Sequence, residues 1–262
     1  MNAKASSAPA RARTPRAPQQ AYVLHSYDWS ETSLILELFT REQGRVAVVA
    51  KGAKRPYSQL RAVLLPFQKL LAVYGSARSE NQEVQNLKSA EWTGTGLMLG
   101  GPAVLTGYYL NELLMKLLPR HDAHPALFDA YTRTLPLLGD TDPARVEAAL
   151  RSFELVLLRE HGVLPALDRV TLTQEVVDPA RRYTLRADSG LGPAAEDEAG
   201  WPGELSRGLE RALEAGALDA LQQICGLALA DLKNRLRHLL HYHLGHQTLH
   251  TRQLMRDLQL LE

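Results

Sequence analysis

The chain has 262 residues, of which 45% are hydrophobic, and a formal net charge of +1 at pH 7. This length and composition allow a sizeable core divided between two compact units. The only cysteine, Cys225, excludes an intramolecular disulfide and a thiolate zinc site, and polar residues interrupt the longest apolar stretch, so we expect no bilayer span and a reducing cytoplasm.

Positive charge is concentrated in the first third of the chain. Residues 1–78 hold twelve lysines and arginines against four acids, a surplus of eight, so the other 184 residues carry a net charge of −7. The surplus centres on the run Lys51–Arg55, which lies beside Tyr57. Such an uneven distribution indicates contact with a polyanion.

Residues 1–20 are predicted to form a disordered basic tail. They hold four cations, no acid and three prolines. So few large apolar side chains cannot offset the entropy cost of ordering the segment, and it lacks the apolar block of a secretion signal. The tail either adds nonspecific attraction to nucleic acid or is a solvated leader without a role, and we favour the leader.

Residues 21–93 have the period of two that is typical of β-strands. Turn residues separate the first three strands, and Ser58 is a candidate N-cap for a short helix that ends before Pro66. This order predicts a five-stranded OB-type β-barrel that binds nucleic acid, although the order alone also permits other small barrels. The predicted strands cover residues 22–26, 34–39, 46–50, 67–74 and 83–92, and the helix covers residues 58–65.

Residues 94–262 are predicted to form an all-helical domain, which makes the fold α+β. Apolar side chains recur with a helical period from Pro102 onward, and Pro143 and Gly162 mark the start and the end of one helix. The pattern breaks into a small irregular insertion at about 164–203, with one hairpin-like strand at 182–186. The predicted helices cover residues 104–118, 127–138, 143–161, 204–214 and 217–244, with a short one from about residue 251.

An ordered series of segments resembles the RecO family of recombination and DNA repair proteins. Gly44–Arg55, Leu65–Phe67 and Leu87–Glu91 are similar to the barrel of that family. The matches to its helical domain, in the same order, are Tyr108–Leu114, His124–Phe128, Phe153–Leu155 and Leu157–Pro165. Many members carry a four-cysteine zinc site next, whereas Asp168–Gln174 contains no cysteine, so the resemblance is to a zinc-free branch.

The resemblance implies a mediator with no enzyme activity and no cofactor or metal. Such a protein binds single- and double-stranded DNA, anneals complementary strands and assists recombinase loading at gaps coated with single-stranded DNA-binding protein, in the RecF pathway. The implied partners are RecR and the acidic C-terminal tail of single-stranded DNA-binding protein. The implied location is the cytoplasm, in association with the nucleoid.

Cations of the predicted barrel are candidates for following a phosphate backbone. Exposed aromatic rings beside them can stack on bases, and Tyr57, Trp29 and Tyr74 are the candidates. The alternatives are a solvated turn for the cations and core packing for the rings. The candidate DNA-binding residues are Arg41, Arg45, Lys51, Lys54, Arg55, Tyr57, Arg61 and Lys69.

The first two predicted helices of the second domain offer a candidate site for an acidic tail. A peptide that ends in an apolar residue and a carboxylate requires an apolar slot with cations at its rim. The alternative is that the apolar members simply form the helical core. The candidate residues are Tyr108, Leu113, Lys116, Leu117, Arg120, Phe128 and Arg133.

Two other functions stay open at this point. His238 and His241 can share one helix face, which leaves a metal-dependent hydrolase as an alternative, although no glutamate lies between them as in a metalloprotease helix. An OB-type RNA-binding module is the second alternative. The glycines from Gly94 to Gly100 lack the spacing and the following lysine of a phosphate loop and fit a flexible interdomain joint.

Overall fold

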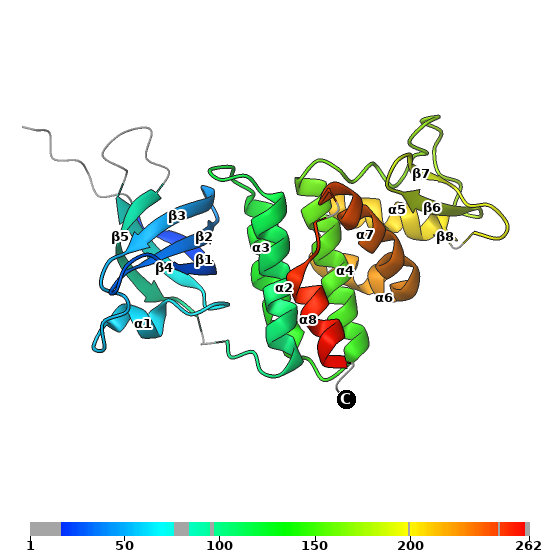
Figure 1. The fold of residues 1–262 in the computed structure, drawn as a ribbon. Helices are drawn as coiled ribbons and strands as arrows, with labels where there is room; N and C mark the ends of the chain where they lie inside the picture. Colours follow the sequence, from blue (N-terminus) through cyan, green and yellow to red (C-terminus); the bar gives the residue numbers. More distant parts are fainter. Residues whose placement is uncertain (1–16, 76–83, 95–96, 199, 246, 260–262) are drawn as a thin grey trace, which may run out of the picture.

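The computed structural model describes residues 17–75, 84–94, 97–198, 200–245 and 247–259. It has a β-barrel followed by a helical region, which confirms the predicted α+β fold (Figure 1). Strand β1 already begins at Gln19, and the predicted tail lies outside the described residues up to residue 16. No helix in the described ranges is both long and apolar enough to cross a bilayer.

Five strands close into a barrel in the order β1-β2-β3-β5-β4. Strands β3 and β5 pair in parallel, and the other described pairs are antiparallel. This is the OB-type barrel that the sequence predicts. Its elements are β1 (Gln19–Asp28), β2 (Leu34–Thr40), β3 (Gly44–Ala50), α1 (Gln59–Val63), β4 (Leu70–Gly75) and β5 (Val84–Trp92).

Alternation along the strands divides the barrel residues between two cores. Leu36 and Leu38 of β2 and Val46 and Val48 of β3 point into the barrel interior. Tyr74 belongs to the same interior cluster and is buried, so its ring is not available for stacking on a base. On the opposite face of β1 and β2, side chains such as Phe39 join the core of the helical domain.

Three helices of the second domain begin with a proline at their first turn, where the missing N–H costs nothing. Asp142 caps one of them by accepting a 2.9 Å hydrogen bond from the Ala144 amide. The helices are α2 (Pro102–Leu117), α3 (Pro125–Thr134), α4 (Pro143–Glu160), α5 (Gly203–Glu214), α6 (Leu218–Gly226), α7 (Leu229–His243) and α8 (His250–Gln259), with the 3₁₀ helix η1 (Leu135–Gly139) after α3.

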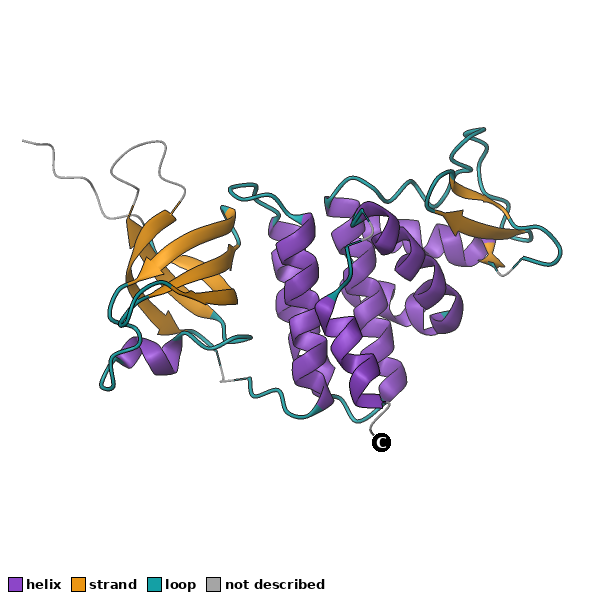
Figure 2. Cartoon of the chain, viewed as in Figure 1, coloured by secondary structure: helices purple, strands orange, loops and turns teal. Residues whose placement is uncertain are grey.

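The prediction of a single helix at 217–244 is wrong, because the chain turns at Leu227 and Ala228 between α6 and α7. The insertion also has more order than predicted. Beside β6 (Arg182–Arg186) it adds β7 (Gly190–Pro193) and β8 (Trp201–Pro202), which form a small sheet in the order β7-β6-β8. Figure 2 shows this sheet at the end of the helical domain that is remote from the barrel.

The outer surface of the barrel packs against α2 and α3 (Figure 1). The rings of Tyr22 and Phe39 contact Phe128 of α3, with centroid distances of 5.5 and 5.4 Å. Tyr131 lies 5.0 Å from Tyr22 and completes the aromatic cluster. The outer face of strands 2 and 3 is where OB folds commonly bind their ligands, and here much of it is covered.

A group of charges around the buried Glu37 links the two domains. Glu37 of β2 is 1% exposed and pairs with Arg45 of β3, at 3.4 Å, and with Arg120, which follows α2. Arg45 also donates hydrogen bonds to the carbonyl oxygens of Met115 and, at 2.7 Å, Leu118. The carboxylate is thus compensated by two guanidinium groups from different domains.

We expect Glu37→Ala to lower the free energy of unfolding by about 3–5 kcal/mol, because it leaves the buried Arg45 without a counter-charge. Urea denaturation followed by circular dichroism measures this cost. Asp129→Asn is the control, since it removes an exposed interdomain ion pair with Arg41 and is expected to have a much smaller effect. Equal losses in the two variants would contradict the assignment of Glu37 as the main electrostatic link.

Candidate nucleic-acid interface

Two loops meet at the end of the barrel that is remote from the helices. Lys54, between β3 and α1, donates through its amide to the Thr32 carbonyl at 3.0 Å. Its Nζ lies 3.0 Å from Asp28 Oδ1 and donates to the Ser30 carbonyl at 3.2 Å. These contacts hold the β1–β2 turn and the β3–α1 loop together, and we call residues 28–33 and 51–61 the loop surface.

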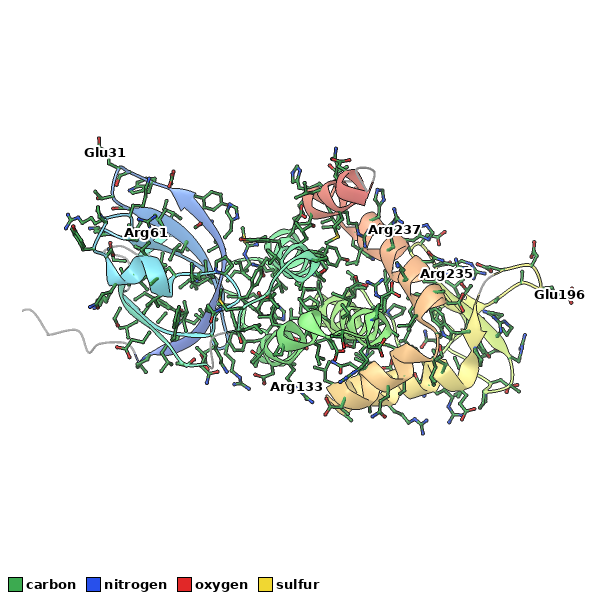
Figure 3. All side chains as sticks on the ribbon, turned by 90° about the horizontal axis from the view of Figure 1, so that it is seen from below. Glu31, Arg61, Arg133, Glu196, Arg235 and Arg237 are labelled. Atoms are coloured by element: carbon green, nitrogen blue, oxygen red, sulfur yellow. The ribbon has the colours of Figure 1, made fainter. Side chains whose placement is uncertain are left out.

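The loop surface exposes cations and aromatic rings together. Tyr57 is 99% exposed and Trp29 is 64% exposed, and Lys51, Arg55 and Arg61 are exposed as well. Figure 3 shows Arg61 on α1 and Glu31 in the β1–β2 turn, both on the barrel and away from the helical domain. A hollow of about 520 Å³ in this surface is lined by Lys51, Gly52, Arg55, Pro56, Tyr57 and Ser58.

The turn at Gly52 leaves room for the Arg55 side chain against the loop backbone. Gly52 has φ +71°, a conformation that side chains with a Cβ rarely adopt. The Arg55 side chain lies over it, with Nε 3.5 Å from the position that a Cβ on Gly52 would take. Cations and neutral rings in one surface suit the phosphates and the bases of a nucleic acid.

The structure separates three predicted DNA-binding cations from the loop surface. Arg45 is buried against Glu37, so we leave it out of the DNA site. Lys69 lies 5.9 Å from the ring centroid of Phe128, beside the helical domain. Arg41 donates two hydrogen bonds, of 3.0 and 2.9 Å, to Asp129 of α3, which raise the pKa of Arg41 and lower that of Asp129.

The predicted tail-binding residues do not form one slot. Leu113, Leu117 and Phe128 are buried in the core, which is the alternative that the sequence left open. The other members face different neighbours: Tyr108 packs on Phe67 with 5.1 Å between ring centroids, Lys116 donates to the Thr248 carbonyl at 2.9 Å, Arg120 pairs with Glu37, and Arg133 pairs with Asp219.

Arg133 instead lies at a groove of about 300 Å³ between α3, α4 and the α5–α6 turn. The second cation of this groove is Arg159, which no sequence pattern indicated, and it donates to both carboxylate oxygens of Glu210 at 2.8 and 2.7 Å. The pKa of Glu210 lies below its usual value: burial raises it, but the hydrogen bonds from Arg159 and the Leu167 amide together lower it by more. The groove is lined by Ala126, Asp129, Ala130, Arg133, Val156, Arg159, Glu160, Ala212, Leu213, Gly216, Leu218 and Leu221.

The C-terminal histidines do not assemble a metal site in the part of the chain that the structure describes. His238 and His241 are exposed on α7, and no described group of three or more His, Cys, Asp or Glu side chains is placed to hold an ion. Burial and the neighbouring His161 lower the pKa of His243. His246 lies outside the described residues, as does Gly96 in the segment that joins the barrel to α2.

Comparison with known proteins identifies relatives over nearly the whole chain. Residues 16–95 match the family model "Recombination protein O N terminal", and residues 101–253 match "Recombination protein O C terminal". A protein of Polaromonas sp. (strain JS666 / ATCC BAA-500), named DNA repair protein RecO, is 51% identical over 93% of this chain and 97% of its own length. The protein of the same name from Variovorax paradoxus (strain S110) is 52% identical over 93% of this chain and 96% of its own length.

Proposed function

Because the chain belongs to the RecO family of DNA repair proteins, we propose that it is a recombination mediator and not an enzyme. In this proposal it binds single- and double-stranded DNA, anneals complementary strands and assists recombinase loading at gaps coated with single-stranded DNA-binding protein. The observation that carries the proposal is the loop surface, where exposed cations and the exposed rings of Tyr57 and Trp29 lie on two adjoining loops.

Annealing of this kind requires no bond chemistry and no cofactor. Two complementary strands repel each other through their phosphates, and bound lysine and arginine side chains reduce that repulsion. Base pairing then supplies the driving force. Stacking on an exposed aromatic ring contributes about 1–3 kcal/mol per base and is independent of sequence, which suits a protein that acts at any gap.

The groove between α3, α4 and the α5–α6 turn replaces the slot expected from sequence as the proposed tail-binding site. Its lining is largely apolar, and Arg133 and Arg159 provide cations for an acidic peptide that ends in an apolar residue and a carboxylate. Arg133 is shared with the site predicted from sequence. RecR is the second proposed partner, and the proposed location is the cytoplasm near the nucleoid.

The two alternatives make different demands on the protein. A hydrolase that uses His238 and His241 requires a bound metal ion and nuclease activity, which metal analysis and a cleavage assay measure. An RNA-binding module requires tighter binding of single-stranded RNA than of single-stranded DNA of equal length. Annealing of strands coated with single-stranded DNA-binding protein, with and without its acidic tail, tests the mediator directly.

We expect the triple variant Lys51→Ala, Lys54→Ala, Arg55→Ala to bind DNA of every sequence more weakly, because phosphate contacts carry no base information. For single strands, three lost contacts reduce the slope of log affinity against log salt concentration by about 2. Fluorescence anisotropy over a salt series measures both quantities.

The matched control for this variant is Arg181→Ala, Arg207→Ala, Arg237→Ala, which removes three exposed cations of the helical domain. It has the same net charge as the loop variant and is expected to keep most of the salt dependence. If both variants lose affinity equally, binding reflects net charge alone and the loop surface is not the DNA site.

We expect Arg133→Glu to weaken binding of an acidic peptide with an apolar C-terminal residue by about tenfold or more, about 1.4 kcal/mol, while DNA binding stays unchanged. Calorimetric titration of the peptide checks this. Arg207→Glu is the control, since it makes the same charge change on α5 outside the groove lining. Unchanged affinity in Arg133→Glu would remove the groove from the proposal.

A further inference from the structure

A second hollow continues the loop surface along the side of the barrel. It has a volume of about 580 Å³, lies between α1 and β5, and shares Ser58 with the hollow of the loop surface. Among the described residues that line it, Lys88 is the one lysine and Glu91 the one acid. The lining residues are Ser58, Gln59, Leu60, Val63, Lys88, Ser89, Ala90, Glu91 and Trp92, and we call this hollow the α1–β5 groove.

Trp92 is held in place and still reaches solvent. Its indole Nε1 donates a 2.8 Å hydrogen bond to the Val63 carbonyl of α1, and its backbone pairs with Leu70 of β4. Even so, the residue is 48% exposed. An aromatic ring fixed before binding loses little side-chain freedom when a ligand stacks on it, so more of the stacking energy appears as affinity.

The chemistry of the groove favours bases over phosphates. Leu60, Val63 and the Trp92 ring are apolar, and Ser58, Gln59 and Ser89 can exchange hydrogen bonds with base edges. The Glu91 carboxylate repels phosphate, so the backbone belongs on the side of Lys88 and of the adjoining cations Lys51 and Arg55.

We propose that the α1–β5 groove holds unpaired bases of single-stranded DNA, with Trp92 as the stacking ring and Lys88 beside the backbone that arrives from the loop surface. This inference rests on the proposed DNA binding and deepens it. Bases in a duplex are already stacked and paired, so the groove selects single strands, whereas the cations of the loop surface accept either form.

The test compares Trp92→Ala and Trp92→Phe for binding of oligothymidine and of a duplex of equal length. Trp92→Ala is expected to lower single-strand affinity about 5- to 150-fold, which corresponds to the stacking energy of one base. Duplex affinity and the salt slope stay unchanged, because the lost ring carries no charge. Trp92→Phe keeps most of the single-strand affinity.

The two variants separate stacking from stability. Both remove the hydrogen bond to the Val63 carbonyl, but only Trp92→Ala removes the ring. If Trp92→Phe binds oligothymidine as weakly as Trp92→Ala, the loss comes from the hydrogen bond to α1 and not from stacking, and the inference is overturned. It is also overturned if Trp92→Ala binds oligothymidine as tightly as the unmodified protein.

Lys88→Ala provides a second measurement that leaves the indole in place. We expect it to reduce the single-strand salt slope by about 0.7 and to leave the duplex slope unchanged. An unchanged single-strand slope would count against a path of the DNA backbone along β5. If the unmodified protein binds no DNA in dilute buffer, the proposed function itself fails. If it binds DNA and the Trp92 and Lys88 substitutions leave that binding unchanged, only the groove proposal is refuted.

Discussion

The arrangement of the molecule depends on the junction between the barrel and the helices. Glu37 is buried between Arg45 and Arg120, and the rings of Tyr22 and Phe39 pack on α3 beside it. This junction covers an outer barrel face that OB folds commonly leave open for a ligand. The barrel therefore presents its remote end and the side formed by α1 and β5, and both proposed DNA contacts lie there.

The positive charge of the first third of the chain is divided between two roles. Arg41 and Arg45 pair with carboxylates at the junction, and Lys69 lies over an aromatic ring of α3. Arg45 is buried with its partner, and Arg41 and Lys69 lie beside the helical domain, so all three are separated from the loop surface. Lys51 and Arg55 are exposed on the loop surface, so the surplus counted from sequence overstates the charge available at the proposed DNA site.

The periodicity of the sequence predicts the barrel and most helices, because alternation and proline placement are local signals. It makes Arg45 a candidate DNA-binding cation, but it does not reveal that the helices bury this residue against Glu37. Leu227 and Ala228 suit a helix and Gly226 is only a weak signal for a helix end, so the break between α6 and α7 depends largely on tertiary packing. Trp92 at the end of β5 reads as an ordinary strand residue until α1 is seen beside it.

Helix α3 connects the two proposed sites. One of its faces, with Phe128 and Tyr131, is fixed to the barrel by aromatic contacts, and another, with Asp129 and Arg133, lines the groove. Asp129 also accepts the hydrogen bonds of Arg41, which lies between β2 and β3. The separation between the loop surface and the groove is therefore set by the packing of a helix and not by the length of a linker. A tail held in the groove is thus kept at a fixed distance from DNA on the barrel.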